Sequence, residues 1–502
     1  MPGPETPMAD PDLAHEADVT TVGHRAGRGL RWAMSGTLAL KVGSFGLSLV
    51  MVRLLAPHEF GLYAVALAAN AFVIHVNDMG MIAATVQWRG DVEEMLATAR
   101  SLAIGFSVTW YAMFWMAAPA LADLAGSGEA TTLVRLLTFL VVIDGVTAVS
   151  VGMIQRRFEH DRLMKAIAVG FAAGSVVTVG LALAGAGALS FIAGALVQGV
   201  LVGVMVLRIA GLPFRLGLDR DVARRLLRFG VPLAAALGVE SVLLFADAIV
   251  VGHVLGTALL GFYLLAFNIS SWVPGLVGTA VRYVSIPAFS RLAEASQEDL
   301  DLGVRRALPL MVALVAPVAA TLFVLSGPLI HVLYGARWVP AGEALRFLAL
   351  VMVARMVASL VFDIQTGVGS TSMVVWVNLV WLSALVPALW WGVHLDGIRG
   401  AAAGHAIASL GVAVPLAGWL LQRCGVDMAP VLRGVVRPVL GGVLAAGVMA
   451  AVAVAVDEPL AELVLAGGVG MVAYLAVVVP RQGWSSLRRR LSSRAQQWEV
   501  RT

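Results

Sequence analysis

The most constraining feature of this sequence is a long succession of apolar runs, each about as long as a membrane-spanning helix. Crossing the hydrocarbon core of a bilayer takes about 20 predominantly apolar residues. Charged or Gly/Pro-marked breaks divide the 502-residue chain into roughly fourteen such runs. Hydrophobic residues make up 59% of the chain and charged residues only 13%, whereas soluble proteins are about 45–50% apolar and about 25% charged. The pattern predicts an all-α polytopic membrane protein and excludes a water-soluble enzyme.

The breaks between the runs predict two groups of six helices, a basic linker between them and a final helix pair. The predicted segments are an N-terminal tail at 1–28, a first lobe at 29–210, a linker at 211–228, a second lobe at 229–423, helices 13 and 14 at 424–483 and a basic tail at 484–502. The N-terminal tail is rich in proline and acidic residues and has no apolar core, so we expect a disordered tail and not a signal peptide.

The distribution of lysine and arginine predicts which side of the membrane each loop faces. Basic residues concentrate in alternate loops, in the linker and in the C-terminal tail, whereas the other loops hold few. Cytoplasmic loops carry the excess of basic residues in membrane proteins. We therefore expect a multi-pass protein of the inner (plasma) membrane with both termini in the cytoplasm.

One stretch of the first lobe is repeated in the second. Leu54–Ala66 aligns with Val254–Ala266 at an offset of 200 residues. The identities fall at Leu55/Leu255, Gly61/Gly261, Tyr63/Tyr263 and Ala66/Ala266. Because the offset covers six predicted helices, an even number, both copies cross the membrane in the same direction. The sequence therefore predicts two parallel six-helix repeats, a plan in which transporters place a site at the repeat interface.

Two pairs of stretches carry a family resemblance. RLLAPHEFGLYAVA and VNDMGMIAATVQ (Val76–Gln87) in the first lobe, and Phe245–Ala266 and Val281–Leu292 in the second, resemble the polysaccharide biosynthesis, or O-antigen (Wzx-like), lipid-linked oligosaccharide flippases of the MOP exporter superfamily. The resemblance covers roughly residues 28–425. It implies a two-lobe MATE/MOP-like fold with a C-terminal helix pair.

The same resemblance implies a function and partners. It implies flipping of undecaprenyl-diphosphate-linked oligosaccharide repeat units across the cytoplasmic membrane by alternating access, for O-antigen, capsule or exopolysaccharide. The partners implied are the lipid-linked oligosaccharide, membrane lipids, a polysaccharide polymerase and glycosyltransferases.

Three basic residues inside or near apolar runs are candidates for binding a diphosphate. Lys41 follows Arg31 by ten residues, about 15 Å along a helix, which places it near the middle of the bilayer. Arg53 closes the first run, and Arg282 lies in the second half of the eighth. A charge at this depth is costly and normally faces a polar interior. A diphosphate needs cationic donors in exchange for lost water, although Lys41 snorkelling to an interface and ordinary helix-end roles for the two arginines stay open.

Four acids and one further arginine are candidates either for ion coupling or for charge pairing: Asp78, Glu240, Asp247, Arg355 and Asp363. Glu240 and Asp247 are seven residues apart and share one helix face, and so do Arg355 and Asp363. A proton or a sodium ion could couple through such carboxylates. The alternative is that they pair with nearby cations and hold helices together.

The linker and the C-terminal tail are expected to lie on the anionic inner leaflet. The stretch FRLGLDRDVARRLLRF (Phe214–Phe229) contains five arginines among apolar residues and predicts a basic amphipathic helix. The tail at 484–502 has a similar basic character. Although the isoelectric point is 9.6, the basic residues alternate with apolar runs, which speaks against a nucleic-acid partner.

Motifs for catalysis are missing from the sequence. It contains no nucleotide loop, metal-ligand cluster or nucleophile–base motif, and its single cysteine, Cys424, excludes a disulfide framework. We therefore predict no enzyme activity, no cofactor and no metal. Three alternatives to a flippase stay open. The first is a MATE-like cation-coupled drug or metabolite antiporter, which would favour an acidic, aromatic cavity. The others are a membrane glycosyltransferase, which the short outer loops disfavour, and a membrane component of polysaccharide assembly without transport.

Overall fold

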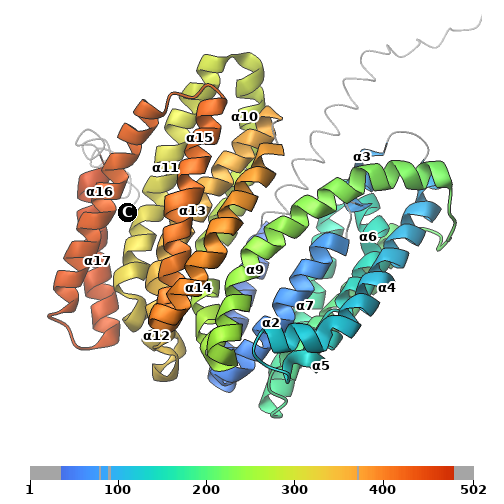
Figure 1. Cartoon of the computed structure of the whole chain (residues 1–502), viewed down its shortest axis with the longest axis horizontal. Helices are drawn as coiled ribbons and strands as arrows, with labels where there is room; N and C mark the ends of the chain where they lie inside the picture. Colours follow the sequence, from blue (N-terminus) through green and yellow to red (C-terminus); the bar gives the residue numbers. More distant parts are fainter. Residues whose placement is uncertain (1–34, 78–80, 89–91, 370–371, 480–502) are drawn as a thin grey trace, which may run out of the picture. The chain divides into compact units, whose positions relative to one another are not determined.

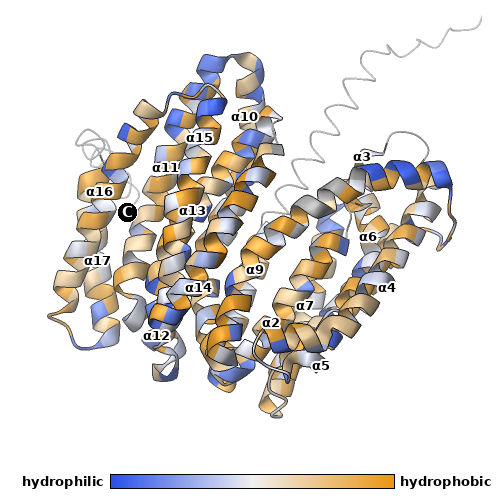
Figure 2. Cartoon of the chain, viewed as in Figure 1, coloured by the Kyte–Doolittle hydropathy of each residue, from blue (hydrophilic) through white to orange (hydrophobic). Residues whose placement is uncertain are grey.

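The computed structural model of the protein describes residues 35–77, 81–88, 92–369 and 372–479. All regular secondary structure in these ranges is helical, and none of the described residues forms a strand (Figure 1). Apolar residues run along most of the helices (Figure 2). The predicted all-α membrane fold class is confirmed.

The helices follow one another with short connections. Those of the first half are Ser35–Leu54, α2 (Pro57–Asn77), α3 (Met81–Gln87), α4 (Val92–Leu124), α5 (Ala130–Leu137), α6 (Leu140–Arg156), α7 (His160–Leu183) and α8 (Leu189–Ala210). Those of the second half are α9 (Arg220–Ser270), η1 (Pro274–Gly278), α10 (Thr279–Ala295), α11 (Gln297–Val324), α12 (Ser326–Tyr334), η2 (Ala336–Trp338), α13 (Ala341–Val368), α14 (Ser372–Ala408), η3 (Ser409–Ala413), α15 (Val414–Arg423), α16 (Met428–Ala453) and α17 (Pro459–Val478).

Twelve stretches of the described chain are long and apolar enough to cross a membrane. Two of them contain a break with non-helical backbone, at Gly256 in α9 and at Asp396–Gly397 in α14. In α14 a Cβ on Gly404 would lie 2.2 Å from the Ala388 carbonyl oxygen, whereas sixteen residues of straight helix span about 24 Å. The chain therefore reverses at this break. If each of the two broken stretches is counted as two spans, the number of spans rises from twelve to fourteen. The count of fourteen spans stays a prediction.

The chain divides into two compact units. Unit 1 comprises the residues up to Leu54, Ala69–Ala120 and Ala130–Gly238, and unit 2 comprises Leu55–Ala68, Leu121–Glu129 and the residues from Val239 onward. The main boundary therefore lies inside α9, close to the predicted boundary between the lobes. Two short segments of the first half, the start of α2 and the turn after α4, belong to unit 2.

Close helix packing relies on small residues in both units. In unit 1 a Cβ on Gly174 of α7 would lie 2.6 Å from the Gly194 carbonyl oxygen of α8. In unit 2 α11, α16 and α17 share a buried cluster that includes Ala316, Ala445 and Ala466. Membrane helices associate through small residues because these let the backbones approach closely.

The linker departs from the prediction in one respect. The predicted amphipathic helix was expected to begin at Phe214, but the helix begins at Arg220, and the residues from Leu212 to Asp219 are irregular. Asp219 explains the late start, because its Oδ1 accepts hydrogen bonds from the backbone N–H groups of Asp221 and Val222, both at 2.9 Å. A helix begins favourably at such a capping residue.

Candidate functional site

An ion pair with a buried carboxylate joins α10 and α13 in unit 2. The Arg282 Nε lies 3.1 Å from the Asp363 Oδ1, and the Ser285 hydroxyl donates a 2.8 Å hydrogen bond to the Asp363 Oδ2. The side chain of Asp363 is 5% exposed and that of Arg282 is 60% exposed. Both carboxylate oxygens are therefore satisfied inside the protein, while most of the arginine stays at the surface of the unit.

This ion pair brings together two residues for which the sequence predicted different roles. Arg282 was a candidate for diphosphate binding, and Asp363 was a candidate for coupling or pairing on one face with Arg355. A guanidinium group carries five N–H donors, and the contact with Asp363 engages the Nε. The carboxylate therefore anchors Arg282 through its Nε, while the arginine side chain stays 60% exposed.

Arg355 turns away from Asp363 although both residues lie on α13. Its Nη1 donates to the Ser271 hydroxyl at 3.3 Å, and its guanidinium lies 5.2 Å from the centre of the Phe267 ring. Both contacts are with the C-terminal end of α9 and the residue that follows it. Arg355 thus links α13 to α9.

A second buried pair joins α9 to α14. The Asp247 Oδ2 lies 3.6 Å from the His405 Nδ1, and the two side chains are 4% and 5% exposed. The hydroxyl of Tyr263, a residue that is 1% exposed, interacts electrostatically with Asp247. Asp247 was predicted as a coupling or pairing residue. His405 was not predicted as a site residue, because the default role of a polar side chain in an apolar run is an interhelical polar contact, and the structure places it in such a contact with Asp247.

The two basic residues of the first helix, Lys41 and Arg53, are exposed. Among the described residues neither has an ion pair. The helix packs on α7 through Gly43, whose added Cβ would lie 2.8 Å from the Phe171 ring. Lys41 precedes Gly43 by two residues, about 200° around the helix. It therefore faces away from α7, and Ser44 beside it is also exposed.

Two further candidates are not placed by the structure. Asp78 lies outside the described residues, and Glu240 lies in α9 with its side chain outside the described set. Among the described residues no group of three or more His, Cys, Asp or Glu side chains could hold a metal ion.

The repeated stretches of the two halves contact each other inside unit 2. A Cβ on Gly61 would lie 1.8 Å from the Thr257 carbonyl oxygen, and a Cβ on Gly261 would lie 1.9 Å from the Pro57 carbonyl oxygen. The offset of 200 residues that aligns Gly61 with Gly261 also aligns Pro57 with Thr257. The contact is therefore reciprocal, and only glycine fits at either position. We call these four residues the reciprocal contact.

Polar and aromatic side chains surround the reciprocal contact. The His58 Nδ1 lies 2.7 Å from the Thr257 hydroxyl, and its Nε2 lies 3.2 Å from the Glu129 carboxylate. Trp338, which is 1% exposed, packs edge-on against Phe60 and Phe262, with ring centres 5.0 and 5.6 Å away. His58 has no counterpart in the second copy, where Ala258 occupies the aligned position.

Comparison with known proteins identifies the family. The model of the polysaccharide biosynthesis protein family matches residues 50–343, more than half of the chain. The chain belongs to this family. A succinoglycan biosynthesis transport protein, ExoT, of Rhizobium meliloti (strain 1021) is 28% identical over 476 residues, which are 90% of this chain and 92% of the relative.

A more distant relative agrees with this family assignment, and a solved structure shares the fold. The lipopolysaccharide biosynthesis protein WzxC of Escherichia coli (strain K12) is 22% identical over 392 residues, 76% of this chain and 78% of the relative. The structure of the lipid II flippase MurJ in an inward closed conformation superposes with a TM-score of 0.73 at 14% identity and covers 92% of this chain and 99% of that one. The family resemblance and the MOP-type fold predicted from the sequence are confirmed.

Five of the candidate charges that the structure describes fall into two kinds. Asp247 and Asp363 are buried and each lies beside a basic residue, whereas Lys41, Arg53 and Arg282 expose their side chains. The exposed charges among these are all basic. An exposed cation of this kind suits an anionic ligand, because desolvated phosphate oxygens need cationic hydrogen-bond donors.

Proposed function

We propose that this protein flips undecaprenyl-diphosphate-linked oligosaccharide repeat units across the cytoplasmic membrane during surface or exopolysaccharide biosynthesis. The observation that carries the proposal is the exposed guanidinium of Arg282, which the buried Asp363 holds in place within a membrane-spanning unit. A guanidinium with free donors binds a diphosphate in bidentate fashion. Membership of a family that includes a succinoglycan transport protein supports the same substrate class.

In this proposal Arg282 binds the diphosphate of the substrate, and Lys41 and Arg53 on the first helix are further candidates for contact with the anionic substrate. The oligosaccharide follows the diphosphate through the protein, and the lipid tail stays in the bilayer. Both termini of the chain lie in the cytoplasm, where the polymerase substrate is assembled by glycosyltransferases before it is flipped.

We propose further that transport proceeds by alternating access and that the reciprocal contact opens during the cycle. The contact consists of backbone atoms in van der Waals contact, with His58 supplying the polar links to Thr257 and Glu129. Separation of these groups leaves no charge buried without a partner, because the side chains of His58 and Glu129 are 45% and 73% exposed. The contact can therefore open at low cost and still close tightly.

The buried pair of Asp247 and His405 is the proposed place for ion coupling. The pair places a carboxylate oxygen and an imidazole nitrogen 3.6 Å apart on side chains that are 4% and 5% exposed. The competing interpretation is that the pair only ties α9 to α14. A double variant separates the two: Asp247→Asn with His405→Gln keeps the size and polarity of both side chains, so a structural pair tolerates it and a coupling site does not.

A drug or metabolite antiporter is the second candidate. It would need exposed acidic groups for a cationic substrate, whereas Asp247 and Asp363 are both buried, each beside a basic residue. A protein that supports polysaccharide assembly without transport would need no exposed cations inside its spans.

Deletion of the gene in its native host tests the proposal. We expect lipid-linked repeat units to accumulate in the cytoplasmic leaflet and surface polysaccharide to fall, and we expect the wild-type chain to restore both. The matched variants are Arg282→Lys, which keeps the charge, and Arg282→Gln combined with Asp363→Asn, which removes the pair. Intact surface polysaccharide with increased drug sensitivity would instead support the antiporter.

Crosslinking tests the opening of the reciprocal contact. Cys424 is the single cysteine of the chain, so Cys424→Ser gives a clean background for His58→Cys with Thr257→Cys. A short thiol crosslinker that joins these two positions should block transport, and a cleavable version should restore it after reduction. Each single-cysteine protein treated in the same way is the control. Full transport by the crosslinked protein would show that the contact is static.

A further inference from the structure

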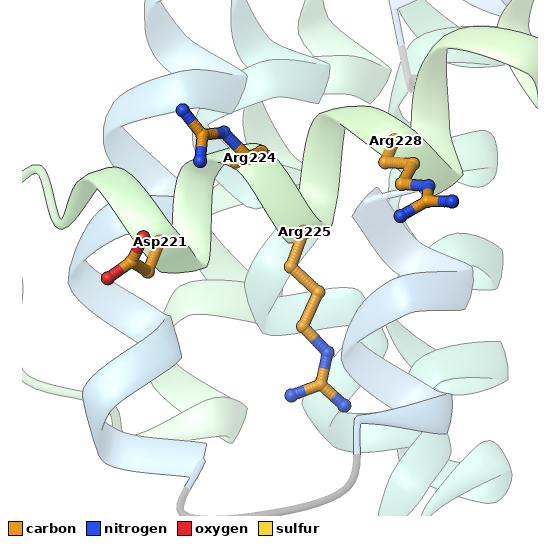
Figure 3. Close-up of a pocket in the computed structure, with 4 residues that line it drawn as sticks. All are labelled: Asp221, Arg224, Arg225 and Arg228. Carbon is orange, nitrogen blue, oxygen red and sulfur yellow. The ribbon is translucent and has the colours of Figure 1, made fainter.

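The start of α9 carries a cationic hollow that the proposed transport does not use. In unit 1 a hollow of about 400 Å³ is lined by Asp221, Arg224, Arg225 and Arg228 (Figure 3). These residues recur at spacings of three and four, so they occupy neighbouring positions on the helix surface. The three arginines and one aspartate give the hollow a net charge of +2.

The arginines of the hollow are available to a ligand. Figure 3 shows their guanidinium groups spread along α9 instead of being drawn together onto Asp221. None of the three has an ion pair with another described residue. Arg225 lies over the Trp88 ring, 4.4 Å from its centre, a contact that orients the guanidinium without neutralising it.

The segment that precedes the hollow is held firmly to α4. The backbone N–H groups of Gly217 and Asp219 donate to the hydroxyls of Ser101 and Thr98, both at 3.0 Å. The buried Arg100 donates from Nη1 to the Pro213 carbonyl oxygen at 2.6 Å. The irregular segment is therefore a built part of unit 1 and not a loose connection.

Apolar side chains project from this held segment. Phe214, Leu216 and Leu218 are 59%, 61% and 68% exposed and occupy alternate positions. Exposed apolar side chains beside arginines are typical of segments that lie in a membrane interface, where the apolar groups enter the acyl region and the cations meet the headgroups. The chain therefore places the exposed apolar residues Phe214, Leu216 and Leu218 a few positions before the cationic hollow.

We infer that this hollow binds the phosphate headgroup of an anionic phospholipid of the leaflet in which the segment lies. Guanidinium groups bind phosphate oxygens through paired, charge-assisted hydrogen bonds. A phospholipid fits better than the oligosaccharide-carrying substrate, because a sugar chain needs many hydrogen-bonding partners, whereas the segment that precedes the hollow in the chain exposes Phe214, Leu216 and Leu218. The inference does not depend on the proposed flippase function, since it concerns a resident lipid.

Native mass spectrometry of the purified full-length protein tests the inference. The probes are phosphatidylglycerol and phosphatidylcholine, added separately to delipidated protein in detergent. We expect wild-type protein to retain phosphatidylglycerol in preference to phosphatidylcholine. The triple variant Arg224→Gln, Arg225→Gln and Arg228→Gln should bind phosphatidylglycerol about tenfold or more weakly, because it loses several charge-assisted hydrogen bonds.

A matched control removes the same charge elsewhere. Arg291→Gln, Arg306→Gln and Arg433→Gln change three exposed arginines of unit 2 and should leave phosphatidylglycerol retention unchanged. A lysine triple at the hollow keeps the charge and should retain part of the binding, which also guards against a misfolded glutamine variant. Equal loss in both glutamine triples would show that the binding is a general charge effect. Displacement of phosphatidylglycerol by undecaprenyl diphosphate would assign the hollow to the substrate carrier instead. Either result overturns the inference.

Discussion

The two halves of the chain differ in what they do with charges at membrane depth. In the first half Lys41 and Arg53 are exposed, and no described residue forms an ion pair with them. In the second half Asp363 is buried against Arg282, and Asp247 is buried beside His405. The buried acids of the second half join helices, whereas Lys41 and Arg53 of the first half have no ion pair with a described residue and are proposed to contact the anionic substrate.

The physical reason for this difference predicts opposite responses to mutation. A carboxylate that loses its partner in the interior is an uncompensated buried charge, which strongly destabilises a protein. An exposed cation has no such dependence, and its removal relieves a costly charge. Stability should therefore respond to mutations in the second half, and transport alone should respond to mutations in the first.

The largest effect is expected for Arg282→Ala, which leaves Asp363 buried with Ser285 as its hydrogen-bond donor. We expect a severalfold loss of folded protein, measured as the monodisperse fraction after detergent extraction. Asp363→Asn should be milder, because the arginine it leaves behind is 60% exposed. Adding Asp363→Asn to Arg282→Ala should restore the amount of protein but not transport. A normal protein level in Arg282→Ala would contradict a structural role for the pair.

The reciprocal contact is where the two halves should respond alike. Gly61→Leu and Gly261→Leu each insert a side chain where even an added Cβ would lie within 2 Å of a carbonyl oxygen. Both substitutions should therefore lower the amount of folded protein. Gly105→Leu is the matched control, because no atom lies within 4 Å of its added Cβ. Normal protein levels and full transport in both variants would show that the repeat matches are coincidental.

Substitutions at Lys41 test whether the exposed cations of the first half bind the substrate. We expect Lys41→Ala to abolish flipping and to leave folded protein in the membrane, and we expect Lys41→Arg to keep part of the activity. Lys41→Glu should be inactive, because a carboxylate repels the diphosphate in a low-dielectric environment. The measurements are protein quantity in purified membranes and accumulation of lipid-linked intermediate.

Two results would change the role of Lys41. If Lys41→Ala lowers the protein level and a neutral substitution at Asp78 or Glu240 restores it, Lys41 is a structural partner of that acid and the contrast between the halves fails. Wild-type flipping by a stable Lys41→Ala protein would remove Lys41 from the binding site.

The smallest effect is expected for His58→Ala, which makes position 58 match Ala258 of the second copy. The loss of one exposed and one partly buried hydrogen bond should leave the protein level nearly unchanged. It should weaken closure of the reciprocal contact, so a Thr257→Cys side chain in the Cys424→Ser background should react faster with a membrane-impermeant thiol reagent. An unchanged rate would show that the backbone contact alone keeps the position closed.

The sequence by itself determined the fold class and the family, and it predicted the position of the repeat. Bilayer thickness sets the length of a spanning helix, so apolar runs identify the spans without any knowledge of packing. The glycine pair at an offset of 200 residues was also visible in the sequence, because two copies of one local motif need no tertiary information to be aligned.

Only the tertiary structure decided which charges meet. Helical spacing placed Asp363 and Arg355 on one face of α13. The fold instead pairs Asp363 with Arg282, a residue 81 positions earlier on another helix. His405 likewise joins Asp247 from a distance of 158 residues. Helical periodicity defines the face of each helix, but the choice of partner depends on which faces pack together. That choice follows from the close approach of small residues on distant helices, which no local pattern encodes.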